Sequence, residues 1–292
     1  MQNSLIEQEV RTLAHRSHTH GLNFYALTDG ALQRSALRQT KAFARPCSLV
    51  PIGGVIARSD LSALPFLVEL SEPELRHRNR LITELSAWAI DHSAVTWLES
   101  RLPVAALAEQ LALRLEAELQ QSLSVVLRFA DARVLPVLYD TFDDEQRNQF
   151  FSCMTNWWYV SRRDELRALP LHHEPGANAS SFKPPLQLTA AQEHQLIDAA
   201  EPDSVMQILR RHDAEALDKI TPSEQYDFVK ASIRRARAWS VETPSDLALF
   251  CMMALEHGPA FDELTNWKAA LTNLRAGKIT LIRVVQQQAT PA

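Results

Sequence analysis

The sequence predicts an α/β N-terminal lobe, in which helices flank a mixed sheet, and an all-α C-terminal helical lobe. Up to residue 169, short apolar runs of strand length alternate with segments rich in helix-forming residues, a pattern typical of an α/β layer. Pro, Gly, Ser and Asn cluster at 170–188, which we interpret as a linker. From 189 to 292, helix start signals and apolar stripes at helical spacing recur. The length of 292 residues accommodates two such domains.

The first lobe begins with short strands separated by helices. Strands are predicted at 23–31, 47–52, 65–70 and 94–100, and helices at 32–43 and 81–90. The first strand ends at Asp29-Gly30, a turn signal. Pro103 lies at a helix start, where its missing N–H is not needed, and the segment 104–121 is rich in Ala, Leu, Glu and Gln. These are the strongest helix formers, so a helix is predicted over 104–121.

Two further strands complete this lobe. The run SVVLRFA (124–130) is β-branched and apolar on both faces, which predicts a central strand. A helical stretch follows to about Phe151, and TNWWYVSRR (155–163) predicts another strand. The expected α/β domain is therefore 1–169.

The C-terminal lobe, 189–292, is predicted to be a bundle of about five helices. Thr189, Thr221 and Thr243 each precede Gln, Glu or Asp at the third helical position. In a capping box the Thr hydroxyl accepts the N–H of that third residue. The apolar run LALFCMMAL (247–255) is far short of the ~20 residues that span a bilayer, so a buried helix is expected there, ending near Gly258-Pro259.

Composition excludes several classes of function. Only seven glycines occur, with no GxGxxG and no GxxxxGK[ST], so phosphate-cradling loops of either common type are absent from the sequence. A net charge of −5 gives no global sign of nucleic-acid binding. The first twenty residues lack a long apolar core, so no signal peptide and no membrane association are expected. The three cysteines lie far apart, which favours a reducing cytosol over a disulfide framework.

No cofactor or metal site is predicted. The histidines fall in HRSHTH (15–20), in the pair His172-His173 and at His194 next to Glu193, without HExxH. No GxSxG occurs, and Cys153 lies in the hydrophobic run FFSCMTNWW. A buried structural thiol is therefore the preferred interpretation of Cys153. No set of residues has the convergent roles of an active site.

Three charges, Arg128, Asp131 and Arg133, follow within six residues of one another at the expected end of the strand 124–130. Asp131 can accept the N–H groups of residues 133 and 134 as a helix N-cap, worth about 1 kcal/mol, and Arg128 is near enough to pair with it. Pro136 would then be the fifth residue of that helix, where proline bends or ends the chain. A structural strand-to-helix junction is preferred over a catalytic cluster.

Two other groups are candidates for binding. Trp157 and Trp158 are adjacent in a predicted strand, so their rings point to opposite faces. Both are buried, or one faces a covering helix or a partner, where tryptophan is enriched. Arg234, Arg235 and Arg237 lie late in the helix that starts at Thr221. We interpret them as a solvated helix face, where an acidic partner peptide could dock. The alternative interpretation is an RNA site.

The stretch LRFADARVLPVLYDTF (127–142) resembles the "FRFYDPRVL" signature of the type VI secretion effector adaptor, or chaperone, family, the domain-of-unknown-function family of Tap and Tec proteins. FYALTDGA (24–31), which contains Asp29, resembles the "YALLDGA" strand that opens that family. PFLVEL, AVTWLES, PVAALAEQLALRL, the signature and DEQRNQFFSCMTNWWYV keep the family's order. The similarity covers about residues 22–150.

The resemblance implies a cytoplasmic adaptor that binds a toxic effector and helps load it onto the spike-tip protein VgrG. Such adaptors are neither secreted nor enzymes, and their partners are proteins rather than nucleic acids or membranes. In such an adaptor the α/β lobe and the helical lobe are expected to form a groove that holds an effector segment. We hypothesise that the signature sets the sheet edge facing that groove and that the helical lobe tunes effector choice. Toxin delivery would be the process that the chain serves.

Some positions depart from the family pattern. The usual Asp-Pro-Arg is Asp131-Ala132-Arg133, the aromatic before the Asp is Ala130, and the His-Leu-Arg of the preceding helix is not evident in EQLALRL (109–115). Two alternatives to the adaptor remain open at the level of sequence. One is a hydrolase that uses Asp131 with a linker histidine. The other is an RNA-binding module that uses Arg234, Arg235 and Arg237.

Overall fold

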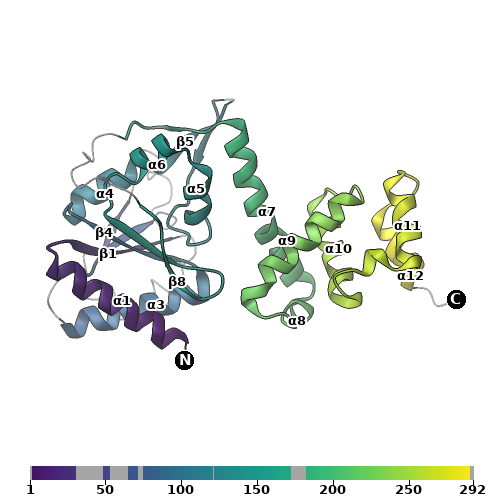
Figure 1. The fold of residues 1–292 in the computed structure, drawn as a ribbon, viewed down its shortest axis with the longest axis horizontal. Coiled ribbons are helices and arrows are strands. Elements are labelled where there is room, and N and C mark those ends of the chain that lie inside the picture. The colour runs from purple at the N-terminus through teal and green to yellow at the C-terminus, as the bar shows by residue number, and fades with distance from the viewer. Residues whose placement is uncertain are drawn as a thin grey trace. The chain divides into compact units, whose positions relative to one another are not determined.

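The computed structural model describes residues 2–30, 49–52, 65–71, 75–120, 122–171 and 182–289. The chain divides into two compact units, Met1–Leu196 and Ile197–Ala292 (Figure 1). The boundary therefore falls after the predicted linker 170–188 rather than within it. The helix predicted at 32–43, the pair His172-His173 and Cys47 lie outside the described residues.

The N-terminal unit contains a six-stranded sheet with the order β2-β3-β1-β4-β7-β8. Every pairing in it is antiparallel. The strands are β1 (Asn23–Thr28), β2 (Leu49–Pro51), β3 (Phe66–Glu69), β4 (Val95–Ser100), β7 (Asn156–Val160) and β8 (Leu166–Ala168). All of them fall within segments that the sequence predicts as strands, except β8, whose segment carries no strand prediction.

Helices cover both faces of this sheet (Figure 1). They are α1 (Gln2–Thr19) and α3 (Leu75–His92) on one face, and α4 (Val104–Ala112), α5 (Leu135–Thr141) and α6 (Asp144–Phe150) on the other. Neighbouring side chains in β4 alternate between the two cores: Trp97 packs toward α1 and α3, and Leu98 toward the opposite helices. This alternation is what the pleat of a strand requires.

A second, three-stranded sheet has the order β6-β5-β9. Its strands are β5 (Glu116–Glu118), β6 (Ser124–Val126) and β9 (Leu186–Gln187). β5 pairs with β6 in antiparallel and with β9 in parallel orientation, so the mixed pairing lies in this sheet. The predicted α/β lobe with a mixed sheet flanked by helices, followed by a helical lobe, is confirmed.

Two sequence predictions fail at this small sheet. The helix predicted over 104–121 ends at Ala112, and β5 follows instead. Leu115 and Ala117 are buried while Glu116 and Glu118 are partly exposed, a two-residue period that tertiary packing enforces over helix propensity. The run 124–130 is not a central strand either: only Ser124–Val126 is a strand, at the edge of the small sheet and with two of its three residues exposed.

The described end of the predicted linker belongs to the N-terminal unit. Phe182, Leu186 and Leu188 are buried in the core that α4, α5 and α6 share with the sheet. Residues 186–187 form β9, which pairs with β5. Three apolar residues among prolines and polar residues were too weak a signal to predict this strand.

The C-terminal unit is helical. Its elements are α7 (Ala190–His212, which begins in the first unit), α8 (Ala214–Leu217), α9 (Pro222–Ala238), α10 (Pro244–His257), a 3-10 turn η5 (Phe261–Glu263), α11 (Thr265–Arg275) and α12 (Leu281–Ala289). Their apolar faces meet in one core that includes Val205, Leu209, Phe250 and Trp267. Val205, Leu209 and Trp267 lie on apolar stripes that helical spacing predicts, whereas Leu264, predicted on the stripe of Trp267, is 50% exposed.

The apolar run 247–255 forms most of α10, as predicted. Leu247, Phe250, Cys251 and Ala254 are buried in the core of the C-terminal unit. The helix ends at His257, and Gly258 follows with a φ of 95°, a conformation that side chains disfavour. Within the described ranges, no helix combines the length and the apolar content needed to cross a bilayer.

The three predicted helix starts behave differently. Thr189 forms a reciprocal capping box with the glutamine three residues later, at N···O distances of 3.0 and 3.3 Å. The Thr243 hydroxyl accepts the third backbone N–H at 3.2 Å. At Thr221 the helix starts as predicted but the predicted capping box is wrong, because the Thr221 hydroxyl bonds to the Glu224 carboxylate and makes no bond to the backbone of the helix. The proline after Thr221 still allows α9 to start there.

Candidate functional site

Four charged residues from two distant segments form what we call the signature cluster: Asp29, Arg128, Asp131 and Arg133. Arg128 Nη2 donates to Asp29 Oδ2 at 2.9 Å, and its Nε donates to the same oxygen at 3.2 Å. The same Nη2 lies 3.7 Å from Asp131 Oδ2. Arg133 binds Asp131 with both ends of its fork, Nη2 to Oδ2 at 2.7 Å and Nε to Oδ1 at 3.0 Å. Arg128 thus links the two carboxylates.

Backbone hydrogen bonds to the start of β4 bring the two segments together. The Asp29 N–H donates to the Ala94 carbonyl at 2.8 Å, where β1 ends beside β4. The Ala132 N–H donates to the Ser93 carbonyl at 2.9 Å. Because Ser93 and Ala94 are consecutive, the end of β1 and the signature dock on the same short turn. This explains why Asp29 joins charges that lie about a hundred residues later in the sequence.

Asp131 organises the turn that leads into α5. Its Oδ1 accepts the Arg133 N–H at 2.9 Å, and its backbone carbonyl accepts the N–H groups of Val134 and Leu135 at 3.0 Å each. The carboxylate therefore binds one of the two predicted N–H groups. The helix begins only at Leu135, so Pro136 lies in its first turn rather than at the predicted fifth position. Proline is tolerated there, and no bend is required.

Burial separates the acids of the signature cluster from its bases. Asp29 and Asp131 are 4% and 1% exposed, whereas the Arg128 and Arg133 side chains are 45% and 30% exposed. A buried carboxylate is costly unless it is paired and hydrogen-bonded. Here every carboxylate faces a guanidinium group, and two positive charges balance two negative ones. This arrangement fits a junction that fastens strand and helix ends, with the arginines at the surface.

The two tryptophans of β7 point to opposite faces, as predicted. Trp157 is fully buried against Phe129 and Phe151, and its indole N–H donates to the Thr96 hydroxyl at 2.9 Å. Trp158 is 7% exposed and packs on the other face, toward α1. Both rings are buried, and Trp158 also lines a surface groove.

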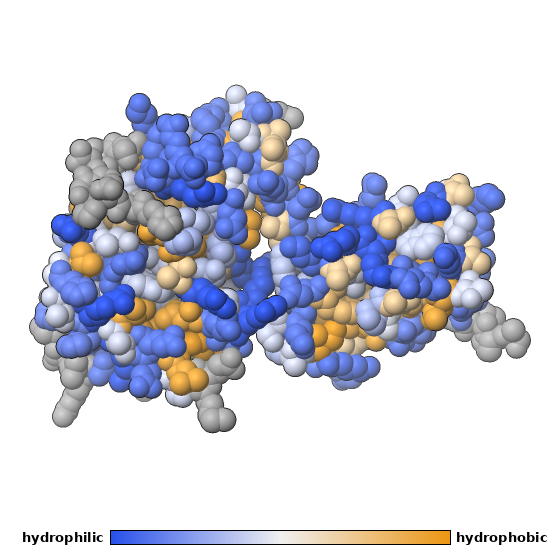
Figure 2. Space-filling view, viewed as in Figure 1, coloured by the Kyte–Doolittle hydropathy of each residue, from blue (hydrophilic) through white to orange (hydrophobic). Residues whose placement is uncertain are grey.

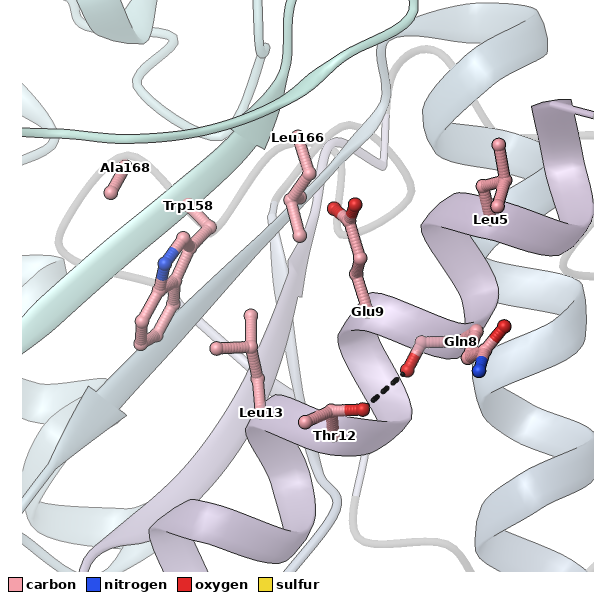
Figure 3. Close-up of a pocket in the computed structure, with 8 residues that line it drawn as sticks. All are labelled: Leu5, Gln8, Glu9, Thr12, Leu13, Trp158, Leu166 and Ala168. Atoms are coloured by element: carbon pink, nitrogen blue, oxygen red, sulfur yellow. Dashed lines mark hydrogen bonds between the residues drawn. The ribbon is translucent and has the colours of Figure 1, made fainter.

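This groove, the α1–β8 groove, has a volume of about 560 Å³ and lies between α1 and the strands β7 and β8 (Figure 3). Leu5 and Leu13 line it from α1, and Trp158 and Leu166 line it from the strands. Figure 3 shows the Glu9 side chain extending from α1 toward Leu166. Figure 2 shows hydrophobic residues gathered over this part of the N-terminal unit. No sequence motif marks the α1–β8 groove.

The arginines of α9 are largely engaged in ion pairs within the C-terminal unit. Arg235 Nη2 bonds to Asp262 Oδ1 at 2.7 Å. Arg237 Nη2 lies 2.9 Å from Glu201 Oε2. Arg234 is exposed. Two of the three positive charges in this basic run are therefore matched by carboxylates, and they pair with different segments of the unit.

Arg114 is a buried residue that sequence reasoning missed. Its side chain is fully buried, with Nε donating to the Phe150 carbonyl at 2.6 Å and Nη2 to the Gln149 carbonyl at 3.2 Å. Its guanidinium carbon lies 4.5 Å from the centre of the Phe182 ring. Burial lowers the pKa of Arg114. The sequence signal for this residue was an arginine inside the apolar run LALRL. In the structure, Arg114 links α6 to the residues that follow α4.

The two described cysteines are buried and have no disulfide partner. Burial raises the pKa of the Cys153 thiol, and the Arg114 guanidinium partly opposes this. Burial also raises the pKa of Cys251 to about 12, against an ordinary value of 9.0. Thiols of this kind are poor nucleophiles at neutral pH, as expected for structural cysteines. Among the residues that the structure describes, no three or more His, Cys, Asp or Glu side chains gather as metal ligands would.

Residues 24–149 match the family model of Domain of unknown function (DUF4123), a family associated with type VI secretion effector adaptor proteins. The matched segment nearly coincides with the residues 22–150 over which the sequence resembles that family. It contains all four residues of the signature cluster, while Trp157, Trp158 and the C-terminal unit lie outside it. Neither a curated protein nor a solved structure matches the chain.

Proposed function

We propose that this chain is a cytoplasmic adaptor that binds a type VI secretion effector and helps load it onto the spike-tip protein VgrG, without being secreted or catalytic. The observation that carries the proposal is the match of residues 24–149 to a family associated with such adaptors. Within that match, the residues of the signature stand in a paired, buried junction rather than in an open reactive site.

The signature cluster suits an adaptor because it makes a rigid support. It fastens the end of β1, the start of β4 and the turn into α5 to one another. Side chains and backbone held in this way lose little further freedom when a partner docks, which favours affinity. The adaptor then works by physical means: it holds a segment of the effector tightly enough to protect it and releases it at the spike.

A hydrolase that uses Asp131 is disfavoured by the contacts of that carboxylate. Both of its oxygens accept hydrogen bonds from Arg133, and Oδ1 also accepts the Arg133 N–H. A general base needs an oxygen within reach of a substrate proton, and a carboxylate that is 1% exposed offers little access. An RNA site on α9 is disfavoured in the same way, because Arg235 and Arg237 already pair with carboxylates.

The proposal is tested by co-expressing the tagged full chain with the effector encoded beside its gene, and separately with the neighbouring VgrG. We expect the effector to co-purify in a stoichiometric complex that survives size-exclusion chromatography. VgrG is expected to join that complex, and the adaptor is expected to stay in the cells when the effector is exported. Failure of the chain to bind both the effector and VgrG would overturn the proposal.

A further inference from the structure

The outer edge of β8 is open for pairing. In the sheet order, β8 is the last strand, and within the described residues nothing pairs with its other side. The Leu169 N–H donates to the Trp157 carbonyl, and the Ser161 N–H donates to the Glu165 carbonyl, both at 2.8 Å. Hydrogen-bonded and non-bonded pairs alternate in antiparallel strands. The backbone groups of Leu166 and Ala168 therefore point away from β7, toward a missing neighbour.

The side chains of the same two residues face the α1–β8 groove. Leu166 and Ala168 line it together with Trp158, the residue that stands opposite Ala168 across β7 and β8. The groove therefore lies beside a row of backbone donors and acceptors with which no described strand pairs. An extended segment placed along β8 would satisfy that row and direct every second side chain toward α1.

The walls of the α1–β8 groove specify what that segment carries. Leu5, Leu13, Trp158 and Leu166 present apolar surface, and Leu5 is 59% exposed, which is high for a residue of this kind. Glu9 is the one charged residue among those lining the groove, and within the described part of the chain it makes no ion pair. A carboxylate beside apolar walls is complementary to a segment with apolar side chains and one Lys or Arg.

We propose that the α1–β8 groove binds an extended segment of the effector, which adds to the edge of β8 as an extra strand. Its alternate apolar side chains lie against Leu13 and Trp158, and a lysine or arginine pairs with Glu9. Because β8 is three residues long, the segment that pairs with it needs only roughly three to five residues. This inference rests on the adaptor function proposed above and assigns it a surface.

Two variants test the proposed surface without touching the buried core. Leu5→Asp places a charge on the apolar wall, and Ala168→Pro removes the outward N–H of β8, a position where proline is compatible with an edge strand. Titration of each full-length variant with the neighbouring effector is expected to show at least roughly tenfold weaker binding, or about 1.4 kcal/mol. The matched control is Leu123→Asp, since Leu123 is exposed to the same 59% on the same unit; it is expected to bind like the wild type.

Charge exchange tests the role of Glu9. Glu9→Lys is expected to weaken binding of the wild-type effector, and a Lys→Glu or Arg→Glu change within the effector segment is expected to restore it. Restoration would identify the segment, because a charge reversal elsewhere in the effector has no partner to rescue. If no reversal among the basic residues of the effector restores binding, the assigned pairing with Glu9 is wrong.

Hydrogen exchange reports directly on the edge of β8. In the free chain the amides of Leu166 and Ala168 are expected to exchange fast, and in the effector complex they are expected to become protected. Protection already in the free chain would mean that a segment of this chain or a second copy covers the edge, and the inference would be overturned. Complex formation with unchanged exchange, and with unchanged affinity for Leu5→Asp, would reject the α1–β8 groove while leaving the adaptor function standing. Absence of any complex would reject both.

Discussion

The signature cluster and the α1–β8 groove lie in the same unit and have opposite characters. The cluster consists of charged residues that pair with one another, with Asp131 only 1% exposed and Arg133 hydrogen-bonded to it at 2.7 Å. The groove consists of ordinary residues with no motif, among them Leu5 at 59% exposure and Glu9 without an ion pair in the described chain. The paired charges of the signature cluster therefore support the fold, and the open surface lies elsewhere in the unit.

This difference separates effects on stability from effects on binding. Replacing a residue of the signature cluster is expected to lower the free energy of unfolding and to leave the partner surface intact in the molecules that stay folded. Replacing an exposed residue of the α1–β8 groove is expected to change the affinity for the partner with little effect on stability. The predictions below use substitutions at each place to break or sharpen this separation.

The largest effect is expected at the tryptophan pair. Trp157→Leu removes a fully buried ring and its hydrogen bond to Thr96, so the free energy of unfolding is expected to fall by about 3 kcal/mol. Trp158→Leu is expected to cost less, because Trp158 borders the groove, but it is expected to weaken effector binding. Urea titrations and binding titrations of both variants check this. If folded Trp157→Leu lost more affinity than Trp158→Leu, the separation would fail.

Asp131→Ala is expected to cost about 2–3 kcal/mol. It removes the cap of the Arg133 N–H together with the two-pronged ion pair, and a cap alone is worth about 1 kcal/mol. Asp131→Asn keeps an oxygen for the N–H and is expected to cost about half as much. Thermal unfolding measures both. An unchanged melting temperature for Asp131→Asn, accompanied by loss of an activity, would favour the hydrolase instead.

A smaller loss, of about 1–2 kcal/mol, is expected for Arg128→Met. The substitution takes two hydrogen bonds from the buried Asp29 carboxylate, but the Arg128 side chain is 45% exposed and water screens its charge. Salt screens partly exposed ion pairs, so the difference from the wild type is expected to shrink between 0.05 and 1 M NaCl, values chosen to take the Debye length from about 10 Å or more to about 3 Å. A salt-independent loss above 2 kcal/mol would place Arg128 among the buried members of the junction.

Near neutral pH, almost no effect on stability is expected from the ionisation of the Cys251 thiol, which serves as an internal control. Because burial raises its pKa from 9.0 to about 12, its thiolate fraction near pH 8 is expected to be roughly a thousandfold lower than that of a free thiol. Alkylation of the native chain at pH 8 is expected to leave Cys251 unmodified, and urea to expose it. The unfolded chain loses the Cys251 proton at a lower pH than the folded chain does, so the free energy of unfolding is expected to fall as pH rises from 9 toward 12. Rapid native alkylation would contradict the burial.

Much of the fold was accessible from sequence because it rests on local patterns. The strands of the main sheet that contain Tyr25, Trp97 and Trp157 lie within the apolar segments of strand length, and α10 follows from a nine-residue apolar run bounded by Thr243 and Gly258. The opposite faces of Trp157 and Trp158 required only the pleat of a strand.

The errors arose where long-range contacts decide the structure. β5 is made of residues with high helix propensity, and it is a strand because Leu115 and Ala117 pack into the core beside the buried Arg114. The run SVVLRFA is apolar, yet only three residues pair, at an edge. The partnership of Asp29 with Arg128 spans 99 positions and was invisible to local reasoning. The α1–β8 groove joins α1 to a strand that no pattern predicted.

One titration tests the central claim most directly: the affinity of the neighbouring effector for the wild-type chain, for Asp131→Asn and for Leu5→Asp, at a temperature where all three are folded. We predict that the wild type and Asp131→Asn bind alike and that Leu5→Asp binds at least roughly tenfold more weakly. Loss of binding in Asp131→Asn, with Leu5→Asp unaffected, would contradict the assignment of the signature cluster to structure and of the α1–β8 groove to the partner.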